Sequence, residues 1–155
     1  MRSQRSEAGS LPGRENLPIL LTVTTGNSGT SLPRKLGISA ESRVLVLGRP
    51  PQTDLGVWDC ARRHTRAGKG RYDVVLAFAA DRATLARRFA PAMAATTTAG
   101  RLWVCWPKRS SGVATDLSDD VVRDFGLAQG VVDVLVCAID DTWSALAFVR
   151  RLRDR

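Results

Sequence analysis

Cysteine and histidine are scarce in this sequence. The three cysteines, Cys60, Cys105 and Cys137, are odd in number, widely spaced and form no C-x-x-C pair. They predict neither a disulfide framework nor a zinc site, and they are typical of a protein from a reducing compartment. His64 is the only histidine, and it lies in a basic stretch that would have to fold back over the chain to serve a catalytic relay. We therefore expect neither metal nor histidine chemistry.

Long apolar runs are also lacking. The longest run near the N-terminus spans residues 17–23, far short of the roughly 18 residues that a membrane span needs. It is also too short for the apolar region of a signal peptide, and Glu7 and Glu15 precede it. We therefore expect a cytoplasmic protein that is not membrane-bound.

Residues 1–30 mix serine, glycine, proline and charged residues around one apolar island at 17–25. This composition predicts a disordered N-terminal lead, in which the island could still add an edge strand or dock on a partner. The remainder has the hydrophobic content of an ordinary globular protein and the length of one domain. We expect residues 31–155 to form a single α/β domain.

Lysine is rare, so arginine carries most of the net charge of +8. Basic residues gather in two short clusters, at 62–71 and 150–155. Such clusters can neutralise the phosphates of a nucleic acid, which makes a nucleic-acid partner one hypothesis. No aromatic residues interleave either cluster as a stacking platform would need, and a solvated basic surface explains the same charge.

Four apolar runs without polar alternation predict strands that are buried on both faces of a parallel sheet. They span residues 43–47, 72–78, 102–106 and 131–139. We expect one of Trp103 and Trp106 to face the core and the other the strand end, because residues three apart cannot share a face of a strand.

Helix signals lie before and between these runs. A short helix over 32–36 should end at Gly37, and a second helix should begin after the N-cap Asp81. A third helix should begin after the N-cap Ser118 and end at Gly126. Residues 96–100 should break the second helix. Residues 142–155 fit either a helix or a strand, and we favour a strand hairpinned onto 131–139.

Ligands collect beyond the carboxyl ends of the strands in open α/β sheets, so the loops there are the candidate sites. The first loop, at 48–51, lacks the G-x-G-x-x-G pattern of a dinucleotide site. Two later loops, at 106–112 and 140–144, predict a site for an anion. The first carries two cations and two hydroxyls, and the second could pair its carboxylates with those cations. The candidate ligand-binding residues are Trp106, Lys108, Arg109, Ser110, Ser111, Gly112, Asp140, Asp141, Thr142, Trp143 and Ser144.

The same two stretches carry a resemblance. The Trp-Pro-Lys-Arg-Ser-Ser-Gly-Val run at 106–113 and the Asp-Asp-Thr-Trp-Ser run at 140–144 resemble the actinobacterial domain of unknown function 3052 family. The resemblance spans about residues 31–151 and implies a Rossmann-like sheet whose C-terminal hairpin is similar to the last strands of class I methyltransferases. With the residue patterns, it predicts a Rossmann-like, mostly parallel sheet of about five to six strands with flanking helices and a C-terminal antiparallel strand.

Three functional hypotheses follow. The first is a non-enzymatic binding module that holds an anionic small molecule or a protein partner at the carboxyl ends of the strands. The second is a minimal or degenerate methyltransferase-like enzyme, although Gly48 stands alone where such enzymes carry a glycine-rich loop for S-adenosylmethionine. The third is a nucleic-acid-binding protein, for which binding should depend steeply on salt. No cofactor follows from the residues themselves.

Overall fold

The structure is a computed structural model and describes residues 30–155. The expected disordered lead and its apolar island lie outside these residues, apart from Thr30. The elements in chain order are α1 (Leu32–Leu36), β2 (Arg43–Leu47), β3 (Arg62–His64), β4 (Tyr72–Phe78), α2 (Arg82–Ala94), β5 (Thr96–Pro107), the 3-10 turn η1 (Arg109–Ser111), α3 (Asp119–Ala128), β6 (Val131–Ala138), β7 (Trp143–Arg150) and the 3-10 turn η2 (Leu152–Asp154).

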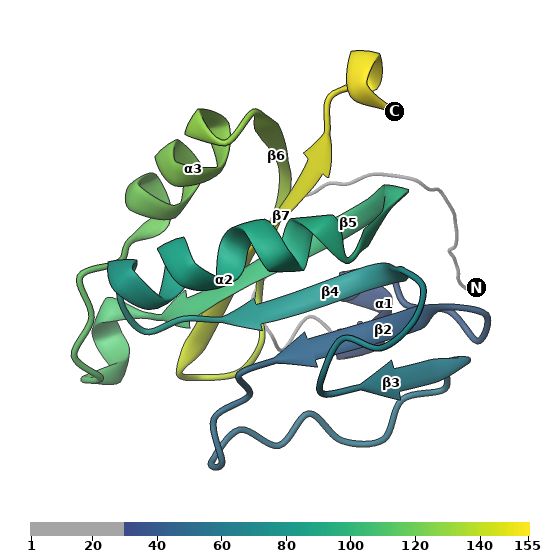
Figure 1. Ribbon diagram of the computed structural model, residues 1–155. Coiled ribbons are helices and arrows are strands. Elements are labelled where there is room, and N and C mark those ends of the chain that lie inside the picture. The colour runs from purple at the N-terminus through teal and green to yellow at the C-terminus, as the bar shows by residue number, and fades with distance from the viewer. Residues whose placement is uncertain (1–29) are drawn as a thin grey trace, which may run out of the picture.

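The six strands form one mixed sheet in the order β3-β2-β4-β5-β7-β6 (Figure 1). β2 pairs in parallel with β3 and β4, and β4 pairs in parallel with β5. β7 pairs antiparallel with both of its neighbours, β5 and β6. The prediction of a Rossmann-like, mostly parallel sheet is therefore wrong, since two of the five strand pairings are antiparallel.

The connections between strands explain this departure. A tight hairpin joins β6 to β7 and places β7 antiparallel between β5 and β6. In a doubly wound fold, a strand in this place would be parallel to its neighbours and reached by a crossover connection. The link from β2 to β3, residues 48–61, contains no helix. The sheet therefore lacks the repeated strand-helix-strand units that cover both faces of a Rossmann-like fold.

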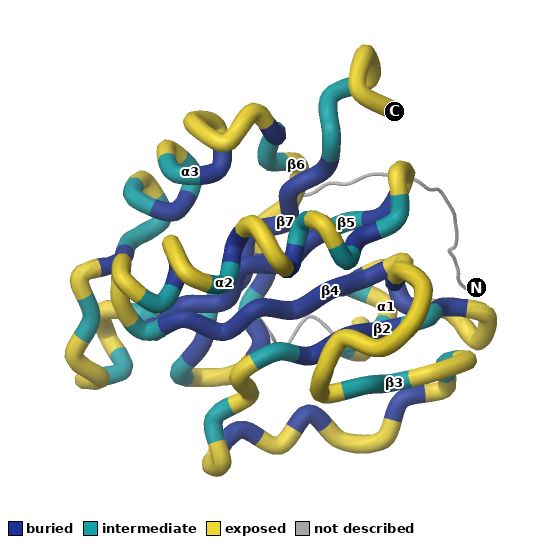
Figure 2. Tube along the Cα trace, viewed as in Figure 1, coloured by how far each residue is buried: buried dark blue, intermediate teal, exposed yellow. Residues whose placement is uncertain are grey.

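The two faces of the sheet are covered in different ways. α2 and α3 lie side by side over one face, where Leu85, Phe89 and Val122 are buried against the strands (Figure 1). The short helix α1 and the link from β2 to β3 cover the other face with Leu36 and Trp58 among others. Figure 2 shows the central strands buried and the outward sides of the helices exposed.

Several local predictions are confirmed. β2 and β4 span the predicted residues, and α1 ends at Gly37, which adopts the left-handed conformation at φ 82°. Asp81 caps α2, because its Oδ1 accepts a hydrogen bond from the Thr84 N–H at 2.7 Å. Ser118 caps α3 in the same way, through the Val121 N–H. The favoured C-terminal strand is present as β7, which pairs with β6.

Other boundaries differ from the predictions. β5 begins at Thr96, not at residue 102, because Thr96 pairs with Tyr72 ahead of a bulge. α3 continues past Gly126 to Ala128, and the glycine is explained by packing, because the Phe148 ring occupies the space that a Cβ would take there. β6 is an edge strand with three exposed apolar residues at 134–136, although the run predicted a strand buried on both faces. The three-residue strand β3 was not predicted at all.

Arg150 closes one corner of this fold, and we expect its loss to be costly. Its guanidinium donates to the carbonyl oxygens of Met93 at 2.8 Å, Thr97 at 2.8 Å and Thr96 at 3.1 Å. Arg150→Met leaves these acceptors without their donor and should lower the free energy of unfolding by about 1–3 kcal/mol in urea titrations. The control Arg153→Met removes an exposed cation and should change it by less than about 0.5 kcal/mol. Equal effects of the two substitutions would contradict this role.

Candidate functional site

The two loops predicted to form a site lie side by side at the carboxyl end of β5. The Lys108 N–H donates to the Thr142 carbonyl at 2.8 Å, and the Lys108 Nζ donates to the Asp140 carbonyl at 2.8 Å. The predicted ion pairing is not formed, since no salt bridge within residues 30–155 joins Lys108 or Arg109 to Asp140 or Asp141. The proximity of the loops is confirmed, and the contact is made through backbone carbonyls.

Most polar groups of these loops are used to hold the loops themselves. The Asp140 carboxylate accepts the N–H groups of Thr142 at 2.9 Å and of Trp143 at 2.8 Å, which fixes the β6–β7 turn. The Ser111 hydroxyl donates to the Lys108 carbonyl at 2.6 Å, and Gly112 ends η1 with φ 80°. These residues build a rigid corner of the fold.

Three of the predicted site residues have exposed side chains that are not used to hold the loops. Arg109, Ser110 and Asp141 are exposed, and their side chains make no hydrogen bond or ion pair to the part of the chain that the structure describes. A ligand at this corner would therefore meet one guanidinium, one hydroxyl and one carboxylate.

The aromatic members of the predicted site belong to the core. Trp106 and Trp143 are buried on opposite faces of the sheet, and Trp143 packs edge-on against Phe78 with ring centroids 5.2 Å apart. Ser144 pairs with Trp106 and Ala138 within the sheet. The expectation that one of Trp103 and Trp106 faces a strand end is wrong, because both are buried in the core.

The histidine and the cysteines hold structural positions. The His64 Nδ1 lies 2.6 Å from the Tyr72 hydroxyl, which also accepts the Gly68 N–H at 2.9 Å. Cys105 and Cys137 are buried in the core, as predicted, and Cys60 is half-buried. Among residues 30–155, no group of three or more histidine, cysteine or acidic side chains is placed to hold a metal ion.

Thiol reactivity should separate Cys60 from the other two cysteines. Burial raises the pKa of the Cys137 thiol to about 11 and the pKa of the Cys105 thiol well above its ordinary value, so neither thiolate forms readily in the folded protein. We expect an aromatic disulfide reagent at about pH 8 to modify Cys60 first and the other two only on unfolding. Cys60→Ser should remove the fast phase. Fast modification of two thiols in the folded protein would refute the assignment.

The first basic cluster begins in β3 at the edge of the sheet and continues into the loop before β4. Within it, the Arg63 guanidinium stacks over the Trp58 ring at 4.2 Å, and on the neighbouring strand β2 the Arg43 guanidinium lies over the Tyr72 ring at 4.9 Å. Both aromatic rings are buried, so they offer no free face on which a nucleic-acid base could stack.

The second basic cluster is largely structural. Arg150 binds three carbonyl oxygens, as described above, and the Arg151 Nε donates to the Gly130 carbonyl at 3.1 Å. The Arg155 Nε donates to the Arg150 carbonyl at 2.9 Å. Hydrogen bonding to the chain's own carbonyls accounts for three of the four arginines in this cluster.

The loop after β2 is closed by a side chain of the protein. Gly48 has φ 72°, and a Cβ at this position would overlap the guanidinium of Arg88. That guanidinium donates a hydrogen bond to the Phe78 carbonyl, which holds it over the glycine. A cofactor approaching the backbone after the first strand would have to displace Arg88.

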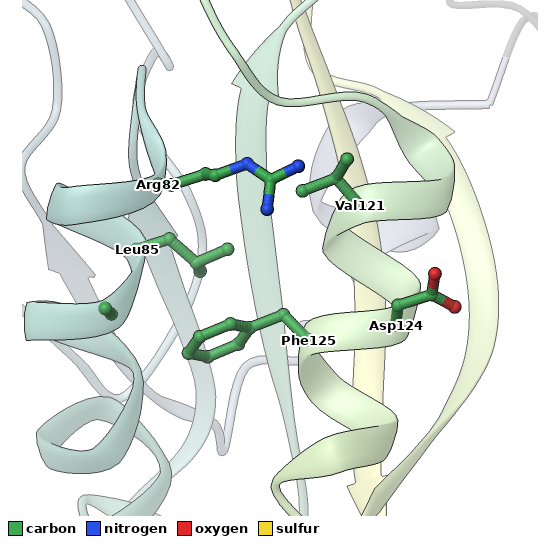
Figure 3. Close-up of a pocket in the computed structure, with 6 residues that line it drawn as sticks. Arg82, Leu85, Val121, Asp124 and Phe125 are labelled. Atoms are coloured by element: carbon green, nitrogen blue, oxygen red, sulfur yellow. The ribbon is translucent and has the colours of Figure 1, made fainter.

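A pocket that the sequence analysis did not find lies between α2 and α3. It has a volume of about 380 Å³, and its lining is mostly apolar: Arg82, Leu85, Ala86, Val121, Asp124 and Phe125. Figure 3 shows the Phe125 ring directed toward α2 and the Arg82 guanidinium extending over Leu85 toward Val121, while the Asp124 carboxylate points away. The Phe125 ring itself rests edge-on against Phe89, with centroids 5.2 Å apart.

Arg82 is placed at this pocket by the start of α2. It follows the N-cap Asp81, and its N–H donates to the Asp116 Oδ1 at 2.8 Å, which ties the helix to the loop after β5. Its guanidinium has no hydrogen bond or ion pair within the described residues. The one sequence signal for this site is the position of Arg82, in the first turn of a helix that begins beyond the carboxyl end of β4.

Comparison with protein-family models, with curated proteins and with solved structures finds no match for this chain. Its resemblance to the actinobacterial domain of unknown function family stays a prediction. No helix within residues 30–155 is long and apolar enough to cross a membrane.

Proposed function

We propose that this chain is a binding module for a small anionic ligand that carries an apolar group. The site is the pocket between α2 and α3, near the carboxyl ends of the strands. The observation that carries the proposal is the unpaired Arg82 guanidinium above a mostly apolar pocket of about 380 Å³. Small-molecule sites commonly combine an apolar lining with a few polar groups that orient the ligand, and this volume lies in their usual range.

The chemistry of the lining defines the ligand class. The apolar part of the ligand packs between Leu85 on α2 and Val121 and Phe125 on α3. A carboxylate at one end of the ligand receives charge-assisted hydrogen bonds from Arg82, whose planar guanidinium matches a carboxylate. An aryl or short acyl carboxylic acid meets both requirements. Arg109 and Ser110, exposed at the same edge of the sheet, are the predicted site for a more polar anion or a partner segment.

The competing hypotheses have less support. Arg88 fills the space over Gly48, which weighs against S-adenosylmethionine binding at the first loop. The cations along β3 have no carboxylate partner within residues 30–155 and would attract any polyanion, so nucleic-acid binding stays a second hypothesis. It predicts binding that vanishes at moderate salt.

A thermal-shift screen tests the proposal. The panel contains phenylacetate and octanoate, their uncharged alcohol analogues, S-adenosylmethionine, phosphosugars, nucleotides and short DNA, each at low and at moderate salt. We expect an apolar carboxylate to raise Tm at both salt concentrations and the alcohols to raise it less. A shift with DNA alone at low salt, or no shift with either carboxylate, would contradict the proposed ligand class.

A further inference from the structure

Another arginine without a partner among the described residues lies on the other face of the sheet. Strand alternation places Arg101 on the same face of β5 as Trp103, whose Nε1 donates to the Leu36 carbonyl at 3.0 Å. The Arg101 guanidinium lies against the end of α1, where a Cβ on Gly37 would be 3.5 Å from its Cζ. The residue is half-buried, and burial lowers the pKa of the guanidinium.

Arg101 differs in its bonding from the other half-buried arginines. Arg150 binds three carbonyl oxygens, Arg88 binds the Phe78 carbonyl, and Arg123 pairs with Asp133 at 3.0 Å. No such bond joins the Arg101 guanidinium to any residue between 30 and 155. A guanidinium that is partly withdrawn from water without a partner is costly, so its hydrogen-bonding capacity is open to a ligand.

This guanidinium borders a polar cavity of about 220 Å³ at the amino end of β5. Thr97, Gly100 and Asp73 line the same cavity, and the Thr97 hydroxyl has no hydrogen bond among the described residues. The Asp73 Oδ2 accepts the Arg43 N–H at 2.8 Å, and Asp73 forms no salt bridge with Arg101. An arginine and an aspartate therefore line one cavity without forming an ion pair with each other.

We propose that this cavity binds a small oxyanion that also carries a hydrogen-bond donor, such as a hydroxy acid or the phosphate ester of a polyol. The carboxylate or phosphate of the ligand binds Arg101 and the Thr97 hydroxyl, and its hydroxyl group donates to Asp73. The volume is below the range of sites for drug-sized ligands, which restricts the ligand to a few heavy atoms. The cavity shares no residue with the α2–α3 pocket and lies on the opposite face of the sheet.

Calorimetric titration with lactate and glycerol phosphate tests this site, with acetate as the analogue that lacks a hydroxyl donor. We expect lactate or glycerol phosphate to bind the full chain. Comparison of their two affinities shows whether the site prefers a carboxylate or a phosphate. Acetate should bind more weakly than lactate. Arg101→Met should weaken binding about 10-fold to 100-fold, whereas Arg82→Met should leave it unchanged, so that this site and the α2–α3 pocket are tested separately.

Thr97→Val supplies a second variant should Arg101→Met fail to fold. It keeps the shape of the side chain and removes only the hydroxyl, so it should weaken binding about 2-fold to 10-fold. The proposal is overturned if neither compound binds, if the affinity of Arg101→Met equals that of the original chain, or if Thr97→Val binds the ligand unchanged.

Discussion

Replacing Trp103 by alanine is expected to lower the free energy of unfolding by about 3–5 kcal/mol, the largest effect on stability that we expect from a single substitution. Trp103 is fully buried at the centre of the sheet face that α1 covers. Its indole Nε1 donates to the Leu36 carbonyl at 3.0 Å, so one side chain both fills the core and anchors the end of α1. Truncation removes the packing and the hydrogen bond together.

Guanidinium chloride unfolding followed by circular dichroism measures this effect. Trp103→Phe separates its two parts, because it retains an aromatic ring and leaves the Leu36 carbonyl without its donor, at a cost of about 1–3 kcal/mol. Val57→Ala is the matched control, since Val57 is 99% exposed and its truncation should change stability by less than about 0.5 kcal/mol. A loss below about 1 kcal/mol in Trp103→Ala would show that α1 does not pack on the sheet as described.

The parts of the fold that follow from short stretches of sequence were predictable. β2 and β4 are unbroken apolar runs, and Asp81 and Ser118 precede helices as capping residues do. Gly37 ends α1 because it takes the left-handed conformation that favours glycine. Each of these features depends on neighbours within a few residues along the chain.

The parts that depend on distant residues were not predictable. β3 is a strand only because three residues of a basic loop pair with β2 across the sheet edge. Gly126 indicates a helix end by its sequence, yet the Phe148 ring from β7 requires its small size inside α3. The apolar run in β6 indicates a buried strand, but its place at the sheet edge is set by the hairpin with β7. Local patterns carry no information on such neighbours.

The candidate site was likewise predictable only in part. The rule that loops gather at the carboxyl ends of strands brought Lys108 and Asp140 together correctly. It could not reveal that the Asp140 carboxylate is used by its own turn, since that depends on the geometry of the β6–β7 hairpin. The α2–α3 pocket is formed by two helices that are separated in the sequence by the 24 residues 95–118, so only the tertiary structure defines it.

Loss of the Arg82 guanidinium is expected to have a large effect on ligand binding at the α2–α3 pocket. Because charge-assisted hydrogen bonds to a carboxylate are strong, Arg82→Met should weaken the binding of an aryl or acyl carboxylate about 10-fold to 100-fold. Ala86→Phe tests the same pocket without altering its charge, since a ring at this exposed position enters the space that the apolar part of the ligand would fill. Both variants should keep the Tm of the unliganded protein within a few degrees, because both side chains are exposed.

The most direct test is calorimetric titration of phenylacetate into the original chain, Arg82→Met and the matched control Arg87→Met. Arg87 is an exposed cation on the same helix that does not line the pocket, so its removal controls for the change in net charge. A binding module centred on Arg82 predicts that phenylacetate binds the original chain and Arg87→Met alike and binds Arg82→Met at least about 10-fold more weakly. Equal affinity in all three proteins, or no binding to any of them, would contradict the assignment of this pocket as the ligand site.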